Sequence, residues 1–205
     1  MKISIILTVF HRVELLPRAV QSILWQTHQD WELLVFEDGE HLDARACIAS
    51  LNKTRPDLLG QLGYAFLDGR QGQAGPWGHA LRRKGLEIAR GNAILWMSHY
   101  DVLHPDCLAA HAGNLAKGPC VSLVGVERWG KTLEYLGRRP EKSERIASDQ
   151  FDLASFCLPV SVARGMQAFP EKYDGLKEAG WLTYAECLEA GLTVRTDYRG
   201  LAARF

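Results

Sequence analysis

Residues 3–39 read ISIILTVFHRVELLPRAVQSILWQTHQDWELLVFEDG, and this stretch decides the fold. It begins with a short apolar run over residues 3–7, broken only by Ser4, which is typical of a buried parallel strand. Apolar side chains then recur at the spacing of one helix face over residues 15–24. A second apolar run, residues 31–36, stops at an acidic turn. The pattern predicts a strand, a loop, a helix and a second strand.

The two loops that follow these strands are expected to face one crevice. In an open α/β sheet, ligands bind outside the carboxyl ends of the strands. One loop, residues 8–11, carries Thr8 and Phe10, and the acidic turn carries Glu37 and Asp38. We therefore expect a ligand site between the two loops. The alternative is that Thr8 and Asp38 only cap the segments that follow them.

Three motifs in this stretch resemble the opening of the family 2 glycosyltransferases with the A-type fold. Members of that family begin with a strand that ends in T-x-Y-N-R, a helix that ends in S-x-L-x-Q-T, and then W-E-L-x-V-x-D-D-G. The corresponding segments of this chain are TVFHR at residues 8–12, SILWQT at residues 22–27 and WELLVFEDG at residues 31–39. The match is long and its motifs follow in the same order.

The resemblance implies an α/β fold: a single Rossmann-like A-type glycosyltransferase domain with a mostly parallel central sheet flanked by helices. Residues 1–115 would form the nucleotide-sugar-binding half and residues 116–205 the acceptor-side half. In the family, the threonine, the aromatic residue and the second acid hold the nucleoside base, which implies this role for Thr8, Phe10 and Asp38. The chemistry agrees, because a carboxylate accepts from a base N–H and an aromatic face stacks on a flat ring.

The composition of the chain excludes several other classes of protein. A length of 205 residues suffices for one domain with a sizeable core. The 24 basic and 24 acidic side chains cancel, which argues against a nucleic-acid binder that relies on a global positive field. The five cysteines form no C-x-x-C pair, as expected of a reduced, cytoplasmic protein. We expect the N-terminal apolar run to be a strand and not a signal peptide, and no stretch reaches the length of a membrane span.

Periodicity and chain-breaking residues predict the remaining elements. Helices are expected over residues 41–55, 79–89 and 107–115, and strands over residues 62–67, 93–97, 120–126 and 193–198. A further strand is expected within residues 149–160, after a loop or short hairpin over residues 128–146. Within that loop, Arg138 and Arg139 either receive an anionic acceptor or are simply solvated. The glycine-rich residues 68–78 form a loop, but no Gly-Lys-Ser/Thr follows to make a phosphate-binding loop of the P-loop type.

Arg82 occupies the place of an arginine that recurs in the family. Residues 81–91 read LRRKGLEIARG and are similar to the family block A-R-N-x-G-L-x-x-A-x-G. The resemblance implies that Arg82 lies near the crevice, where a guanidinium can neutralise a diphosphate. The alternative is that Arg82 belongs with Arg83 and Lys84 to a solvated helix face.

The chain departs from the family at its metal-binding motif. Residues 98–108 read SHYDVLHPDCL, against D-x-D-D-V-W-H-P-D-x-L in the family. In this register the paired acids fall on Ser98 and Tyr100, and only Asp101 survives. Those acids normally bind Mg²⁺ or Mn²⁺, because such cations prefer carboxylate oxygens and neutralise the leaving diphosphate.

Three alternatives follow from this departure. His99 and Asp101 form a weaker or rearranged metal site, which suits Mn²⁺ better than Mg²⁺. Otherwise Arg82, His79 or His99 meets the diphosphate charge without a metal. In the third alternative the protein has lost transfer activity.

The acceptor side resembles the family less closely. Inverting family members carry a catalytic base in an E-D-W-D-L-W-x-R-like helix, and here the corresponding acids fall on Ala179, Gly180 and Leu182. The nearest carboxylates are those of Glu178 and Asp174, so either is a candidate base. Each would otherwise be an ordinary surface carboxylate. Trp181 keeps its place in the pattern and either stacks on a sugar ring or fills the core.

The resemblance implies a cytoplasmic transferase that moves a sugar from a nucleotide-diphospho-sugar, with UDP expected as the nucleotide, to a glycan hydroxyl. The resemblance also implies an inverting reaction, a glycan or lipid-linked acceptor and a role in cell-surface polysaccharide synthesis. The protein is then expected to work at the inner face of the membrane or with a partner transferase. A rival is a non-catalytic nucleotide-sugar-binding or scaffold subunit, since two acidic motifs are eroded. A nucleotidyltransferase is disfavoured, because no glycine-rich signature followed by a basic residue stands near the N-terminus.

Overall fold

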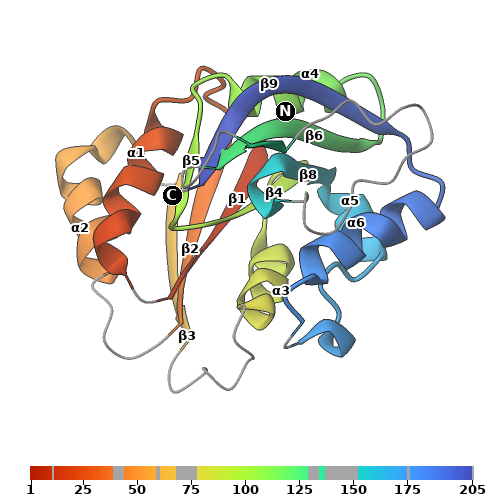
Figure 1. The fold of residues 1–205 in the computed structure, drawn as a ribbon. Coiled ribbons are helices and arrows are strands. Elements are labelled where there is room, and N and C mark those ends of the chain that lie inside the picture. The colour runs from red at the N-terminus through yellow and green to blue at the C-terminus, as the bar shows by residue number, and fades with distance from the viewer. Residues whose placement is uncertain are drawn as a thin grey trace.

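A computed structural model describes residues 1–10, 12–38, 44–58, 61–67, 78–128, 134–136, 152–174 and 176–204. Within these ranges one twisted sheet lies between two layers of helices (Figure 1). Its strands are β1 Ile3–Val9, β2 Trp31–Asp38, β3 Leu62–Leu67, β4 Ala93–Ser98, β5 Asp101–Leu103, β6 Val121–Arg128, β7 Glu134–Leu136, β8 Phe156–Pro159 and β9 Val194–Arg204. None of the helices in these ranges is long and apolar enough to cross a lipid bilayer.

The strand order is β3-β2-β1-β4-β8-β6-β9-β5, with β7 paired to β6. The first four strands run parallel, and β6 and β9 also pair in parallel. In contrast, β8 runs antiparallel to β4 and β6, and β5 runs antiparallel to β9. The mostly parallel sheet expected from the sequence is therefore confirmed, with the antiparallel pairs in its second half.

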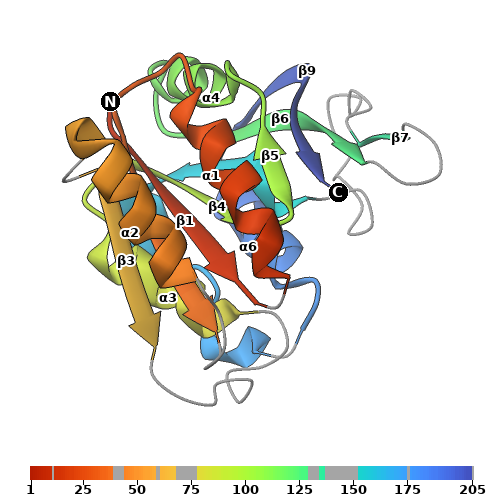
Figure 2. The same cartoon turned by 90° about the vertical axis from the view of Figure 1, so that its left-hand side faces the viewer.

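Six α-helices in the described ranges cover the two faces of the sheet. They are α1 Leu16–Leu24, α2 Ala44–Thr54, α3 His79–Ile88, α4 Cys107–Leu115, α5 Val160–Gly165 and α6 Ala179–Glu189. Short 3-10 turns at Val13–Leu15, Pro56–Leu58, Leu153–Ser155 and Glu171–Tyr173 connect them. Figure 2 shows α1 and α2 in front of β1 and β2, while α3 and α6 lie behind the sheet.

The core divides into two clusters because alternate strand residues point to opposite faces. On one face, Ile5 of β1 and Leu33 of β2 pack with apolar residues of α1, α2 and α4. On the other face, Ile6 and Leu34 pack with α3, α5 and α6. Both faces are covered, which explains why the strands read as near-continuous apolar runs instead of alternating patterns.

Helix α3 lies unusually close to β1, and Gly85 makes this possible. A Cβ added at Gly85 would come within 2.6 Å of Cγ2 of Ile6, whose side chain is fully buried. A glycine at this position therefore brings the helix backbone down onto the strand. The close packing fixes where the N-terminal end of α3 lies relative to the end of β1.

Several element boundaries differ from the sequence-based predictions. The predicted first loop and acidic turn are partly strand. Strand β1 continues to Val9 and β2 continues to Asp38, because both strands are buried up to their last residues. The strand predicted within residues 149–160 is present but short, because β8 is preceded by a 3-10 turn and followed directly by α5. The C-terminal strand is longer than expected, because β9 continues past a bulge to pair with β5.

Two other outcomes concern particular segments. The short strand β5 was not expected, and it forms by antiparallel pairing with β9 after the turn that follows β4. The predictions for residues 68–77 and for Arg138 and Arg139 lie outside the described residues.

Candidate functional site

A cavity of about 200 Å³ opens at the carboxyl ends of the parallel strands. The register places Thr8 at the end of β1 opposite Ser98 at the end of β4. Asp38 ends β2 on the other side of β1. The cavity is lined by Thr8, Val9, Phe10, Asp38, Gly78, Leu81, Arg82, Ser98, His99 and Tyr100. The structure therefore brings together five residues singled out from the sequence, namely Thr8, Phe10, Asp38, Arg82 and His99.

One part of the cavity offers a carboxylate and an aromatic ring. Asp38 and Thr8 are buried, at 5% and 7% exposure, whereas Phe10 is 38% exposed just beyond the end of β1. A carboxylate at the base of a cavity accepts hydrogen bonds from a ligand, and an exposed ring is available for stacking. This combination suits a flat heterocycle with an N–H group.

Another part of the cavity is electropositive. The first turn of α3 begins at the cavity, since Gly78, the residue before the helix, lines the wall and adopts a left-handed backbone with φ of 67°. Backbone N–H groups at a helix N-terminus and the helix dipole favour an anion there. Arg82, one turn into the helix, adds a buried guanidinium to the same wall. Together they make this wall suited to a phosphate.

Arg82 is held by His79 of the same helix and by Phe169, which lies far along the chain. Its Nη1 lies 2.8 Å from Nδ1 of His79, and its guanidinium carbon lies 5.5 Å from the centre of the Phe169 ring. The imidazole of His79 stacks on Phe169 at 5.6 Å, and its Nε2 lies 2.8 Å from the carbonyl oxygen of Leu176. Segments far apart in the sequence thus meet behind the cavity wall.

The residues that replace the acidic motif form a tight turn between β4 and β5. The Asp101 carboxylate is 2% exposed and accepts the backbone N–H of Ser98 at 2.7 Å. The Ser98 hydroxyl accepts the backbone N–H of Tyr100 at 3.3 Å, and the rings of His99 and Tyr100 lie 4.0 Å apart. Asp101 is absent from the residues that line the cavity. Its carboxylate stabilises the turn by accepting the Ser98 N–H.

The donor set at this turn is poor in ligands for a divalent metal ion. Among the residues that the structure describes, no three histidine, cysteine or carboxylate side chains come together in a way that would hold one. The positions of the paired acids carry the neutral hydroxyls of Ser98 and Tyr100. Mg²⁺ and Mn²⁺ prefer carboxylate oxygens, which this wall lacks among its described residues apart from Asp38.

Arg12 is a charged residue near the cavity that the sequence analysis did not single out. Its guanidinium lies 5.9 Å from the centre of the Tyr100 ring, and the Tyr100 hydroxyl lies 3.5 Å from the carbonyl oxygen of Phe10. Arg12 has a left-handed backbone with φ of 44° and directly precedes the 3-10 turn at Val13–Leu15. The signal was present, because Arg12 closes the TVFHR motif at the end of the first strand.

The two candidate bases lie away from the cavity lining. Both oxygens of Asp174 accept from Arg83, at 2.7 and 2.8 Å, and these hydrogen bonds lower the pKa of the Asp174 carboxyl. Glu178 is exposed at the residue before α6 and does not cap that helix with its side chain. Trp181, half-buried, packs against the core cluster beneath α6. Of the two carboxylates, Glu178 is the one without an arginine partner among the described ion pairs.

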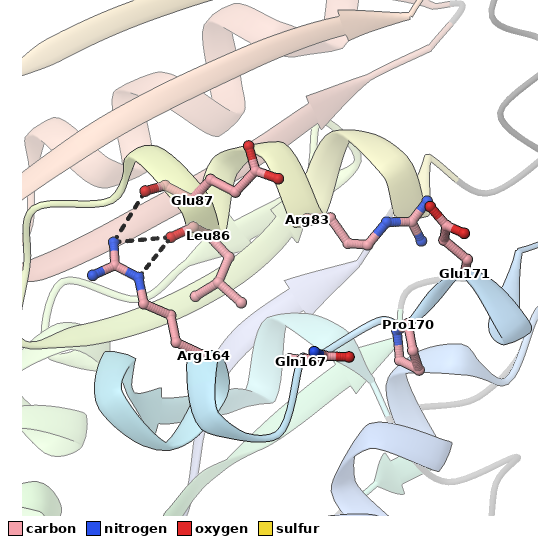
Figure 3. A pocket seen from close by; sticks show the side chains of 8 residues that line it. Arg83, Leu86, Glu87, Arg164, Gln167, Pro170 and Glu171 are labelled. Carbon is pink, nitrogen blue, oxygen red and sulfur yellow. Dashed lines mark hydrogen bonds between the residues drawn. The ribbon is translucent and has the colours of Figure 1, made fainter.

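A second cavity, of about 630 Å³, lies between α3 and α5 (Figure 3). Its two arginines are engaged in holding the fold. Arg164 donates to the carbonyl oxygens of Leu86, Glu87 and Ala89 at the end of α3, and Arg83 binds the Asp174 segment. Although this cavity is the larger, the residues that suit a nucleotide converge on the smaller one.

Comparison with known proteins reveals a family match over most of the chain. The model of Glycosyl transferase family 2 matches residues 4–164. An uncharacterised glycosyltransferase of Nostoc sp. is 32% identical over 108 residues, covering 53% of this chain and 31% of the relative. GalNAc(5)-diNAcBac-PP-undecaprenol beta-1,3-glucosyltransferase of Campylobacter jejuni is 26% identical over 159 residues, covering 76% of this chain and 48% of the relative. The chain thus spans less than half the length of these relatives.

Solved structures share the fold at low sequence identity. Residues 1–349 of S. aureus TarS, in complex with UDP-GlcNAc, superpose with a TM-score of 0.79 at 16% identity, over 99% of this chain and 58% of those TarS residues. The mannosyltransferase PcManGT of Pyrobaculum calidifontis, in complex with GDP-Man and Mn²⁺, gives a TM-score of 0.73 at 18% identity, over 98% of this chain and 56% of its own.

Proposed function

The chain belongs to glycosyl transferase family 2, and we propose that it transfers a sugar from a nucleotide-diphospho-sugar to a hydroxyl of a glycan acceptor. The observation that carries the proposal is the cavity at the strand ends. There a carboxylate, an exposed aromatic ring and a buried arginine near a helix N-terminus line one cavity. These are the groups that a flat base and a diphosphate would need.

We expect UDP to be the nucleotide of the donor. Asp38 would accept the N–H of uracil, Phe10 would stack on its ring, and Thr8 would line the same side. Two observations support this proposal. The side chains have the hydrogen-bonding and stacking groups that uracil needs, and the chain shares its fold with TarS, which was solved with UDP and with UDP-GlcNAc. Because PcManGT was solved with GDP-Man, a guanine nucleotide belongs in the same test.

We propose that the charge of the leaving diphosphate is met by Arg82 and the N-terminus of α3 instead of by a metal ion. The donor set at residues 98–101 supports this, since two of its acids are replaced by hydroxyls and Asp101 is used by the turn. Fixed positive charge directed at a developing negative charge is a large catalytic effect in a site that excludes water. PcManGT was solved with Mn²⁺, so the alternative of a rearranged metal site is tested directly below.

Glu178 is the proposed general base of an inverting reaction. The acceptor oxygen would form a bond to the anomeric carbon while the bond from that carbon to the diphosphate oxygen breaks. The acceptor proton would pass to Glu178, and the nucleoside diphosphate would leave. Glu178 is preferred to Asp174, because hydrogen bonds from Arg83 lower the proton affinity of the Asp174 carboxylate.

The acceptor and the location are proposed from the relatives and the cysteines. The Campylobacter relative is named for an undecaprenol-linked glycan, which supports a lipid-linked acceptor and work at the inner face of the membrane in polysaccharide synthesis. All five cysteines are unpaired, as expected of a reducing cytoplasm. One observation favours a second candidate function, a non-catalytic donor-binding subunit: the acidic positions of the motif are occupied by Ser98 and Tyr100.

Calorimetric titration with UDP, GDP and dTDP, each with Mn²⁺ and with a chelator, tests the donor site first. We expect UDP to bind with similar affinity in both conditions, and Asp38→Ala to weaken the binding of UDP at least tenfold. Turnover of UDP-sugars then separates an enzyme from a binding subunit. If none of the three nucleotides binds to the folded protein, the proposed function is wrong.

A further inference from the structure

We infer that His79 is a positioning residue that holds the Arg82 guanidinium in the donor cavity and ties it to the chain segment before α6. The inference rests on the proposed function, because it assigns Arg82 to the diphosphate. His79 does not line the cavity itself. It would act through Arg82 and would contact neither the nucleotide nor the sugar.

The hydrogen bonds of His79 require one particular form of its ring. A guanidinium only donates, so Nδ1 of His79 accepts from Nη1 of Arg82 at 2.8 Å. A carbonyl oxygen only accepts, so Nε2 carries the proton and donates to Leu176 at 2.8 Å. The neutral ring protonated on Nε2 is the one form that satisfies both partners. A protonated ring would turn an N–H toward the arginine and lose this hydrogen bond.

The surroundings of His79 keep its ring neutral. The side chain is 2% exposed. Burial, and then the nearby charge of Arg82, lower the pKa of His79 to about 4, with Arg83 adding to the effect and Asp174 opposing it. These groups face the ring from α3 and from the segment after the Glu171–Tyr173 turn. At neutral pH the ring is therefore available as an acceptor for the arginine.

The position of Arg82 is defined on two sides. His79 contacts its Nη1, while the Phe169 ring lies beneath the guanidinium and stacks on the imidazole with an interplanar angle of 22°. A guanidinium fixed in this way need not reorganise when the diphosphate arrives. A lysine-like flexible cation, or an arginine without these supports, would lose side-chain entropy on binding instead.

The same histidine joins the two halves of the domain. Leu176 lies 97 residues from His79 and just before Glu178, the proposed base. A change in this segment on acceptor binding would act on the imidazole and so on the donor arginine. The hydrogen-bonded chain from Leu176 through His79 to Arg82 is thus a physical link between acceptor side and donor side.

Three substitutions of His79 separate its hydrogen bonds from its packing. The carbonyl oxygen of His79→Asn lies near the place of Nδ1, so it still accepts from Arg82. The amide nitrogen of His79→Gln lies near the place of Nε2, so it still donates to Leu176. His79→Phe keeps the ring stacked on Phe169 with no hydrogen bond. Lys84→Gln, on the exposed side of α3, is the matched control.

The measurement compares the affinity for UDP with the affinity for uridine, which lacks the diphosphate. Wild type, His79→Asn and Lys84→Gln are expected to prefer UDP to uridine by a similar factor. In His79→Phe and His79→Gln, UDP binding should weaken about tenfold or more, while uridine binding changes less than threefold. Thermal unfolding of each variant establishes that the protein is folded.

Each result decides the inference. Loss of UDP preference in His79→Phe with rescue in His79→Asn supports it. If folded His79→Phe keeps the UDP preference of the wild type, or if all variants weaken uridine and UDP alike, the inference is overturned while the proposed function stands. If wild type binds neither ligand, the proposed function fails, and the inference fails with it.

Discussion

The carboxylate of Asp101 accepts the backbone N–H of Ser98 at 2.7 Å, so the one acid left from the metal-binding motif closes the turn between β4 and β5. This arrangement gives the carboxylate a structural task. It also explains why Asp101 is buried although the cavity lies close by. A substitution that keeps the accepting oxygen but removes the negative charge can therefore test the two roles of Asp101 separately.

Asp101→Asn should therefore leave donor binding unchanged. The asparagine oxygen still accepts from Ser98, while the charge needed for a metal is removed. We expect UDP affinity within about twofold of wild type, with or without Mn²⁺, by calorimetry. Asp101→Ala should lower the free energy of unfolding by about 1–3 kcal/mol, because the Ser98 N–H loses its partner. Mn²⁺ that tightens UDP tenfold in wild type but not in Asp101→Asn would instead establish a metal site.

Arg82→Gln should weaken the binding of UDP and spare that of uridine. Removing a charge-assisted contact to a diphosphate costs about 1.5–3 kcal/mol, or roughly ten- to a hundredfold in affinity. Asp38→Asn serves as the opposite control, because it should weaken UDP and uridine by the same factor. Equal loss of both ligands in Arg82→Gln would contradict the assignment of this arginine to the diphosphate.

Glu178→Gln should lower the rate of transfer at saturating substrate while UDP affinity stays within twofold. A general base contributes about a hundred- to ten-thousandfold. Asp174→Asn is the comparison, since its carboxylate binds Arg83. It should lower stability more than it lowers the rate. A Glu178→Gln enzyme with wild-type turnover would remove Glu178 from the mechanism.

Glu32→Gln should destabilise the fold without touching the cavity. The buried Glu32 carboxylate accepts from the Ser4 hydroxyl at 2.6 Å, from the backbone N–H of Arg90 at 2.5 Å and from the Arg90 side chain at 3.0 Å. An amide nitrogen cannot accept these bonds, so we expect a loss of about 1–3 kcal/mol in urea unfolding. Asp57→Asn, which breaks an exposed pair with Arg55, should leave the midpoint unchanged.

The same carboxylate makes the fold sensitive to strong acid. Burial raises the pKa of Glu32, but the hydrogen bonds from Ser4 and Arg90 outweigh burial, so its pKa lies below the ordinary value of 4.5. Its contribution is present above that value and is lost as the pH falls through the lowered pKa. Glu32→Gln should therefore be less sensitive than wild type to a fall in pH below about 4.5.

Two buried histidines should make stability fall at a milder pH. Burial lowers the pKa of His79 to about 4 and that of His111 to about 3. Between about 6.5 and these values the unfolded chain binds protons that the folded protein does not, so stability falls as the pH falls. Each histidine contributes a slope of up to about 1.4 kcal/mol per pH unit. Urea unfolding at several pH values measures the slope, and His79→Asn should reduce it while the exposed His104→Gln should not.

Much of the N-terminal part of the chain could be predicted because its information is local. Apolar runs and helical spacing marked β1, α1 and β2, and the strand-end rule placed Thr8 and Asp38 at one crevice. The register confirms that their strands are neighbours. Strand ends were predicted too early, since Thr8 and Asp38 are polar in type yet buried within strands. The type of a residue does not by itself show whether a polar side chain is buried within a strand.

The C-terminal part of the chain was harder to predict because its contacts join distant segments. The bidentate pair of Arg83 with Asp174 and the bond from His79 to Leu176 each span more than 90 residues, as the separations of 91 and 97 show. Periodicity reports which face of a helix is buried, and it does not report which partner covers that face. From the sequence, Asp174 and Glu178 were therefore equivalent candidates for the base, and only the tertiary structure shows that Asp174 is paired with Arg83.

The sequence by itself determined the order of strands and helices from β1 to β4, the family, and the residue types at the ends of β1, β2 and α3, because side-chain periodicity and short motifs act within a few residues. Only the tertiary structure decided that Asp101 closes a turn, that Asp174 is paired, and that a neutral His79 supports Arg82. These outcomes depend on hydrogen bonds between groups that folding brings together after the local elements are set. Whether a donor meets an acceptor in these hydrogen bonds depends on the three-dimensional arrangement of the chain, which the spacing of residues along the sequence does not reveal.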